Sequence, residues 1–245
     1  MTEPGEQRPL ALSFGAVART YAAVRPRYFA PLLDRAQHVL ELPSSARVLD
    51  LGAGTGRLTR ELVLRFASVV AVEPDDEMRA LLVEGVVVAG TAEAIPVDSG
   101  SVDAVFVGEA FHWFDAGRAI AEIARVLVPR GRLALISTHW WETEPELPES
   151  VLTLLREPFT RSFAERRPPW DGAFADSPFE PLRSERFEEE MTVDADLLLA
   201  LYSTTSSLAA LPDDERTALL AAVRHQLTGP YRLPIKHELS WTRLV

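Results

Sequence analysis

Short apolar runs alternate with helical segments through the first half of the chain. Runs at residues 47–51, 69–73, 86–88, 102–107 and 133–136 are rich in Val, Leu and Ile. Strand sequences that are apolar throughout, instead of at every second position, belong to strands buried on both faces. The pattern predicts an α/β fold in which helices cover both faces of a parallel sheet.

Helices are expected between these runs, at 57–66, at 75–84 and after Asp115. The second and third of them have an aspartate where an N-cap is needed, at Asp75 or Asp76 and at Asp115. A short acidic side chain at this position accepts hydrogen bonds from the free backbone N–H groups of the first turn.

The ends of the chain have a different composition. Residues 1–12 are predicted to be a flexible tail, and Pro26 and Pro31 divide the helical pattern that follows. Two more strands are expected at 186–193 and 232–243, with helices at 194–202 and 213–227. We expect one domain at 13–245, made of an N-terminal helical lid (13–43), a core (44–139), an insertion or lid (140–185) and C-terminal strands and helices (186–245).

Composition and charge narrow the function classes. The 245-residue chain has a formal net charge of −11, no cysteine and five scattered histidines. Cysteine chemistry is excluded and a metal site has no support, while the negative charge argues against a nucleic-acid partner. No apolar stretch is long enough to span a bilayer, and the acidic N-terminus differs from a signal peptide. We therefore expect no metal, no nucleic-acid or membrane partner, and a cytoplasmic location.

The first apolar run ends in the glycine-rich turn Gly52-Ala53-Gly54-Thr55-Gly56. Glycine lets the backbone approach a ligand closely. A dinucleotide-binding turn would have its third glycine at position 57, which is Arg57 here. Asp50, just before the turn, would repel a pyrophosphate but can accept a hydrogen bond from an ammonium group. The turn therefore favours a ligand with a cationic end.

A second carboxylate, Glu73, ends the next apolar run. A carboxylate about 20 residues after the first glycine of such a turn accepts hydrogen bonds from ribose hydroxyls. A ribose joined to a cationic amino-acid end describes S-adenosylmethionine. The alternative is that Asp50 and Glu73 are merely polar residues at the ends of buried strands.

Five short motifs follow one another in the chain, at residues 48–56, 72–74, 90–96, 110–114 and 125–131. In this order they resemble the class I S-adenosylmethionine-dependent methyltransferases, and more narrowly the type 11 small-molecule group that includes trans-aconitate-like enzymes. The resemblance extends from about residue 14 to 137. It implies a Rossmann-like sheet of seven strands with the last antiparallel, helices on both faces and a lid insertion after the fifth strand. It also implies S-adenosylmethionine as cofactor and a small-molecule acceptor.

The resemblance further implies which residues bind the cofactor. Thr91, Ala92 and Glu93 should line the adenine site, and Glu109 should lie beneath the methionine part. An N-terminal element should cover the cofactor, with Arg25 pairing with the methionine carboxylate. Plain loop, cap and surface roles are the alternatives for these residues. The full predicted set is Phe14, Tyr21, Arg25, Tyr28, Asp50, Gly52, Ala53, Gly54, Gly56, Glu73, Pro74, Thr91, Ala92, Glu93 and Glu109.

Aromatic residues after the fourth and fifth runs are expected to line the acceptor pocket. His112 is placed where a general base could reach an acceptor, so it is the candidate catalytic residue. The alternative is that these residues only pack as a wall under the lid. His237, on the apolar face of the last strand, is expected to be a satisfied core histidine. The predicted acceptor-pocket residues are Phe111, His112, Trp113, Trp140 and Trp141.

Three other functions compete with methyl transfer to a small molecule. A nicotinamide-dependent oxidoreductase is disfavoured by Arg57 and Asp50. A non-catalytic regulatory domain that binds S-adenosylmethionine would keep the same pocket. A nucleic-acid base methyltransferase would carry an Asn/Asp-Pro-Pro-Tyr/Phe tetrad after the fourth run, where this chain has Gly108-Glu109-Ala110-Phe111. The acceptor atom, whether oxygen, nitrogen or carbon, and the oligomeric state stay open.

Overall fold

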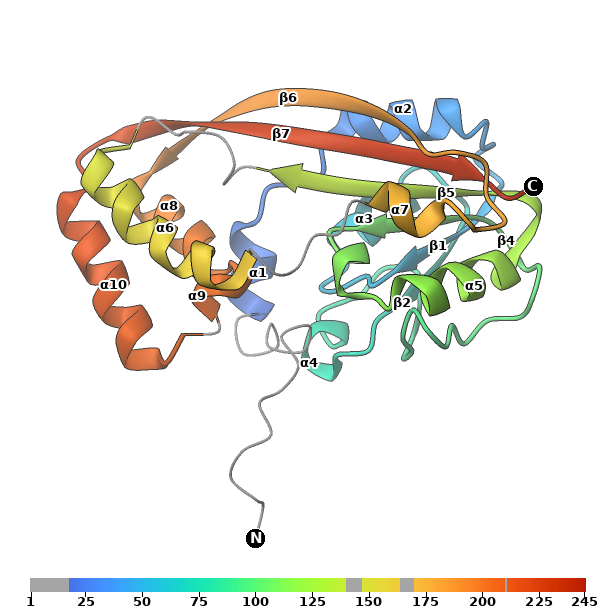
Figure 1. Ribbon diagram of the computed structural model, residues 1–245, viewed down its shortest axis with the longest axis horizontal. Helices are drawn as coiled ribbons and strands as arrows, with labels where there is room; N and C mark the ends of the chain where they lie inside the picture. The colour runs from blue at the N-terminus through green and yellow to red at the C-terminus, as the bar shows by residue number, and fades with distance from the viewer. Residues whose placement is uncertain (1–17, 140–146, 164–169, 210) are drawn as a thin grey trace, which may run out of the picture.

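A computed structural model describes residues 18–139, 147–163, 170–209 and 211–245 of the chain. Seven strands form one sheet in the order β3-β2-β1-β4-β5-β7-β6. Strand β1 pairs in parallel with β2 and β4, whereas β7 is antiparallel to both β5 and β6. The predicted Rossmann-like α/β sheet with an antiparallel last strand is confirmed (Figure 1).

Strands and helices alternate along the first half of the chain, as the apolar runs predicted. The strands are β1 (Arg47–Leu51), β2 (Ser68–Val72), β3 (Val86–Val88), β4 (Val102–Gly108), β5 (Leu127–His139), β6 (Arg183–Asp194) and β7 (Pro230–Arg243). The helices are α1 (Ala18–Val24), α2 (Ala30–Val39), α3 (Arg57–Val63), α4 (Asp76–Arg79), α5 (Ala116–Val126), α6 (Glu149–Phe163), α7 (Trp170–Phe174), α8 (Ala195–Ser203), α9 (Ser206–Ala209) and α10 (Asp213–Gln226), with a 3₁₀ turn, η3, at Phe111–Trp113.

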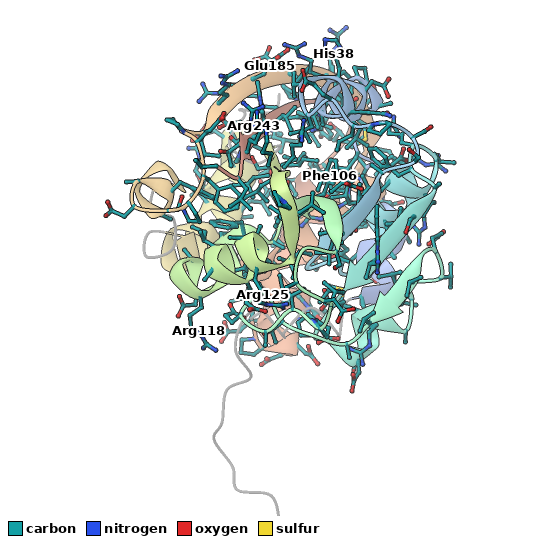
Figure 2. All side chains as sticks on the ribbon, turned by 90° about the vertical axis from the view of Figure 1, so that its right-hand side faces the viewer. His38, Phe106, Arg118, Arg125, Glu185 and Arg243 are labelled. Atoms are coloured by element: carbon teal, nitrogen blue, oxygen red, sulfur yellow. The ribbon has the colours of Figure 1, made fainter. Side chains whose placement is uncertain are left out.

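Separate apolar clusters cover the two faces of the sheet. Ile123 of α5 belongs to the cluster that contains Val105 of β4. Leu33 of α2 and Leu58 of α3 belong to the cluster that contains the next residue, Phe106, which lies in the interior of the molecule in Figure 2. Because consecutive residues of a strand point to opposite faces, burial on both faces explains why this strand is apolar at nearly every position.

Helices α6, α8, α9 and α10 form a helical lobe at one end of the sheet (Figure 1). Its core includes Val151 of α6, Leu198 of α8 and Val223 of α10, all fully buried. Strands β6 and β7 stay paired as far as Asp194↔Pro230, well beyond the last pair of β5 with β7, His139↔Lys236. The two long strands therefore connect the lobe to the rest of the sheet.

The helix predicted at 75–84 is shorter than expected. Asp75 caps it as predicted, accepting hydrogen bonds from the N–H groups of Glu77 and Met78, but α4 ends at Arg79. The chain then turns so that Leu82 packs beneath the glycine-rich turn, where a Cβ on Gly56 would lie 2.9 Å from Leu82 Cγ. This tertiary contact takes the place of the last part of the predicted helix, residues 80–84, which is about one and a half turns.

The later strands are longer than their predicted cores. Strand β5 was expected at 133–136, but Leu127 already pairs with Val102 at its start. The strands predicted at 186–193 and 232–243 are β6 and β7, which are extended at their ends by pairing with each other. The described part of the predicted insertion contains α6 and α7, and Asp115 caps α5 as predicted.

Two kinds of feature are absent from the described residues. They contain no helix long and apolar enough to cross a membrane. Nor do they contain a group of three or more His, Asp or Glu side chains that could hold a metal ion.

Candidate functional site

A pocket of about 440 Å³ opens at the carboxyl ends of β1, β2 and β4. The order of the sheet reverses between β1 and β4, and ligands of open α/β sheets bind at such a reversal. Most of the residues predicted to bind the cofactor line this pocket: Tyr21, Tyr28, Asp50, Gly52, Ala53, Gly54, Glu73, Pro74, Thr91, Ala92, Glu93 and Glu109.

The glycine-rich turn forms the floor of the pocket. The N–H groups of Gly52 and Ala53 both donate to Val72 O, at 2.9 and 3.0 Å, so the turn is held against the end of β2. Gly54 has φ +59°, and a Cβ there would have only Met78 Sδ nearby, at 3.9 Å. The space next to Gly54 is thus open as far as the described residues are concerned. Gly56, which was predicted to contact the ligand, is not among the described lining residues and instead begins α3 at φ +81°.

Asp50 places a buried carboxylate at the pocket with one oxygen unused. Thr59 Oγ1 donates to Oδ2 at 2.6 Å, while Oδ1 has no hydrogen-bond partner within the described parts of the chain. Burial raises the pKa of Asp50 to about 7, against the lowering effect of the Thr59 hydrogen bond, and nearby Glu73 raises it further. A buried acceptor without a partner is costly, so this oxygen suits a ligand that brings a donor or a positive charge.

The carboxylate of Glu73 is held in one orientation. Gly54 N–H donates to Oε2 at 2.7 Å and Asp75 N–H donates to Oε1 at 2.9 Å. Burial raises the pKa of Glu73, while these two backbone donors lower it. Each oxygen retains acceptor capacity toward the pocket, since a carboxylate oxygen can accept more than one hydrogen bond.

Tyr21 and Tyr28 of the N-terminal segment and Arg57 of α3 form one part of the pocket wall. The Arg57 guanidinium lies 5.1 Å from the ring centre of Tyr28 and 5.6 Å from that of Tyr21. Its Nη2 donates to Pro26 O, whereas its buried Nε has no partner in the described ranges. Arg57 lines the pocket, although we singled it out only as the residue that breaks the dinucleotide pattern.

Arg25 does not lie where the resemblance implied. It is not among the described lining residues. Its Nε donates to Thr204 Oγ1 at 2.9 Å and its Nη2 to Thr204 O at 3.0 Å, so the side chain is directed to the end of α8. Burial lowers the pKa of this guanidinium. No pattern in the sequence pointed to this contact, because Thr204 is remote along the chain and looks like an ordinary helix end.

Glu109 combines an unusual backbone with a fixed side chain. Its φ is +59°, in the left-handed region that costs a non-glycine residue about 1–2 kcal/mol. Its side-chain Oε1 accepts a hydrogen bond from Thr138 N–H of β5, and the residue lines the pocket. A strained conformation retained beside a pocket is a common property of functional positions.

The predicted acceptor residues separate into different places. Trp113 lines the pocket together with Phe114, which was not predicted. Phe111 is buried in the core instead, with its ring 5.7 Å from that of Phe174. His112 packs against Trp113 at 4.7 Å between ring centres and is not among the described lining residues.

Three of the predicted residues, Phe14, Trp140 and Trp141, lie outside the residues that the structure describes. His237 is a satisfied core histidine, as predicted. It is buried, with Nε2 3.0 Å from Glu189 Oε1 and Nδ1 3.1 Å from Thr138 Oγ1.

Comparison with known proteins gives one family. Residues 49–135 match the family model described as a methyltransferase domain. An uncharacterized methyltransferase of Mycobacterium tuberculosis is 40% identical over 226 residues, which cover 90% of this chain and 88% of the relative. A malonyl-[acyl-carrier protein] O-methyltransferase of Methylococcus capsulatus is 38% identical over 66% of this chain and 62% of its own. The fold is shared with a solved structure from Anaeromyxobacter dehalogenans, a candidate type II methyltransferase (TM-score 0.60, 23% identity, 89% of this chain and 97% of that one).

Proposed function

The chain belongs to the class I S-adenosylmethionine-dependent methyltransferases, and from that premise we propose that its pocket binds S-adenosylmethionine and that its acceptor is a small molecule. The observation that carries the proposal is the pair of buried carboxylates at the ends of neighbouring strands. Asp50 has an oxygen without a partner and Glu73 is held by two backbone donors. These are the acceptors that an ammonium group and a ribose diol require.

The lining supports one orientation of the cofactor. Asp50 would accept a hydrogen bond from the amino group, and Glu73 would accept hydrogen bonds from the ribose hydroxyls. The base would then lie against Thr91, Ala92 and Glu93, at the carboxyl end of β3. The open space next to Gly54 is available to the part of the cofactor between the ribose and the amino acid.

Arg57 replaces Arg25 in our proposal as the partner of the cofactor carboxylate. Its guanidinium is held by Pro26 O and by the two tyrosine rings, which leaves the buried Nε as an unused donor. An arginine held in this way can donate to a carboxylate with little further loss of side-chain entropy.

Catalysis would depend mainly on alignment. S-adenosylmethionine supplies a methyl group on a positively charged sulfur, open to in-line attack by oxygen, nitrogen or carbon. The four aromatic residues that line the pocket, Tyr21, Tyr28, Trp113 and Phe114, would exclude water from the reacting atoms and orient the acceptor. Such positioning can contribute about 7–11 kcal/mol to the lowering of the barrier.

Two observations support a small acceptor. The net charge of −11 opposes binding of a polyanion such as nucleic acid. The pocket is bounded by aromatic side chains, as in sites that enclose a small organic molecule. The name of the Methylococcus relative points to another acceptor, a malonyl group on a carrier protein, and the experiment must separate the two.

Calorimetry and isotope transfer test the proposal. We expect the purified protein to bind S-adenosylhomocysteine with a Kd in the micromolar range and not to bind NAD. With S-adenosylmethionine labelled on the methyl group and a whole-cell extract that holds both metabolites and acyl-carrier proteins, mass spectrometry should find the label in a small-molecule product. Label found only on an acyl-carrier protein would overturn the small-molecule acceptor, and tight NAD binding would overturn the assignment of the pocket.

A further inference from the structure

The loop of residues 89–99, between β3 and β4, forms the wall of the pocket that would face the cofactor base. Gly90, Thr91, Ala92 and Glu93 line the pocket. Apart from one isolated bridge, Thr91↔Ala94, the loop has no regular structure of its own. A wall of this kind keeps its shape only if neighbouring elements hold it.

An ion pair on α5 holds the middle of this loop. Glu122 Oε2 accepts a hydrogen bond from Ile95 N–H at 2.8 Å, and Arg125 Nη2 donates to Ile95 O at 2.7 Å. Both backbone groups of Ile95 are thereby satisfied by two side chains that also bond to each other, with Arg125 Nε donating to Glu122 Oε1 at 2.7 Å.

Arg125 extends the contact along the loop. Its Nη1 donates to Val97 O at 3.0 Å and to Ser99 Oγ at 3.3 Å. A guanidinium can serve these acceptors and the Glu122 carboxylate together because its five N–H groups form a planar fork. The hydrogen bonds from Arg125 lower the pKa of Glu122, so the pair is ionised at neutral pH.

The start of the same helix holds the loop at the pocket itself. Asp115 N–H donates to Oε1 of Glu93 at 2.9 Å, and Asp115 is the N-cap of α5. The loop is also folded tightly on itself, since a Cβ on Gly90 would lie 2.5 Å from Pro96 Cδ. The helix therefore holds the loop at two points, one on either side of Ala94.

The ion pair is not needed to anchor α5. The helix is fixed to the sheet by buried Ile120, Ile123 and Val126 on its apolar face. Arg118 on the same helix is exposed, and Figure 2 shows it at the periphery of the molecule. Arg125 is directed instead to the 89–99 loop, as its hydrogen bonds to Ile95 O and Val97 O show. Arg118 therefore provides a matched control for Arg125.

We propose that Glu122 and Arg125 are positioning residues that fix the 89–99 loop as the recognition wall for the adenine base, although neither lines the pocket. The inference rests on the proposed function, because it takes the ligand at this wall to be the base of S-adenosylmethionine. Any displacement of Ile95 would shift Thr91–Glu93, which lie two to four residues away in a loop that doubles back on itself.

The test compares two ligands that share the base and ribose. S-adenosylhomocysteine carries the amino-acid end, whereas 5′-methylthioadenosine lacks it. We expect Arg125→Ala to raise the Kd of both ligands by about tenfold and by the same factor, the scale of a lost charge-assisted hydrogen bond. Arg125→Lys should give a smaller loss. Its ammonium group keeps the positive charge and can serve some of the acceptors, but it cannot serve all of them. Arg118→Ala should bind both ligands like the parent.

Folding is checked by circular dichroism, and binding is measured well below each variant's melting temperature. If Arg125→Ala does not fold, Arg125→Lys and Glu122→Gln take its place, with a weaker loss in the same direction. If a folded variant binds both ligands within twofold of the parent, Glu122 and Arg125 only support the fold, and the inference is overturned. A loss for S-adenosylhomocysteine alone would also overturn it, because the effect would then lie at the amino-acid end. If the parent itself binds neither ligand, the proposed function fails instead.

Discussion

The backbone N–H of Gly54 donates a 2.7 Å hydrogen bond to Oε2 of Glu73, which joins the turn after β1 to the end of β2. The conformation of the turn and the orientation of the carboxylate therefore depend on each other. Glycine at position 54 permits the positive φ that points this N–H at Glu73. The glycine-rich turn and Glu73, which were recognised separately in the sequence, thus form one structural unit.

Removing this carboxylate should weaken cofactor binding strongly. We expect Glu73→Ala to raise the Kd for S-adenosylhomocysteine by ten- to a hundredfold, about the scale of one or two charge-assisted hydrogen bonds. Glu73→Gln should lose less, because its amide oxygen still accepts a hydrogen bond. Calorimetry on both folded variants checks this order, and normal binding by Glu73→Ala would contradict the ribose assignment.

Affinity for S-adenosylhomocysteine should fall as the pH is lowered through 7. Burial raises the pKa of Asp50 to about 7 in the free protein. Only the ionised carboxylate pairs with the ligand ammonium group, so below pH 7 the Asp50 carboxyl must lose a proton before the ligand binds. The Kd should then rise by at most about tenfold for each pH unit. Above pH 7 the affinity should level off. Calorimetry between pH 5.5 and 8.5 measures the profile.

Asp50→Asn is the control for this profile. An asparagine cannot ionise, so the variant should bind weakly at every pH and lose the step near 7. A parent profile that stays flat from pH 5.5 to 8.5, or a step that persists in Asp50→Asn, would show that Asp50 is not the group that titrates with binding.

Arg25 of the N-terminal segment and Arg57 of α3 should differ in their effects on two ligands. Arg57→Ala is expected to weaken S-adenosylhomocysteine about tenfold and to leave 5′-methylthioadenosine unchanged, because only the first ligand has a carboxylate. Arg25→Ala removes its hydrogen bonds to Thr204 and should not distinguish the two ligands. Competition binding measures the ratio of the two Kd values for each variant. If Arg25→Ala weakened S-adenosylhomocysteine alone, Arg25 and not Arg57 would be the partner of the cofactor carboxylate.

His112 should prove dispensable as a general base. Within the described pocket it is not a lining residue and packs against Trp113. Once an acceptor is identified, His112→Gln should turn over within a few-fold of the parent, whereas loss of a positioned base costs about 10²–10⁴-fold. A fall of that size with unchanged cofactor affinity, and a flattened acidic limb of the pH profile, would restore the catalytic role.

The parts of the structure that the sequence predicted are those set by local pattern. Apolar runs locate β1 to β5 because strands buried on both faces have no polar side, and the glycine turn with Asp50 and Glu73 locates the pocket. The contacts of Arg25 and Arg57 could not be predicted in this way because their partners come from tertiary packing. Thr204 is distant along the chain, and the tyrosines beside Arg57 meet it only once the N-terminal segment is in place.

The direction of each aromatic side chain near the pocket could not be predicted from the sequence. Phe111 and Trp113 are two residues apart, yet one enters the core and the other lines the pocket, since η3 turns the chain between them. A run of aromatic residues indicates that a wall exists but does not say which ring faces the cavity. The short α4 has the same kind of cause, because the packing of Leu82 beneath Gly56 outweighs a helical pattern.

The long β6–β7 pair belongs to the sheet at one end and is joined to the helical lobe at the other. A hinge motion of the lobe relative to the sheet would have to bend this strand pair and stretch the hydrogen bonds between β6 and β7. We therefore expect the lobe to resist such a motion. The segment of residues 18–29 is smaller, and its Tyr21 and Tyr28 line the pocket. It meets the lobe through the packing of α1 on α8, the packing of Val24 on the lobe core and the Arg25–Thr204 contact. We expect ligand access to depend on movement of this segment more than on movement of the lobe. A stiff strand pair beside a smaller covering segment would let the cofactor exchange without any bending of the sheet.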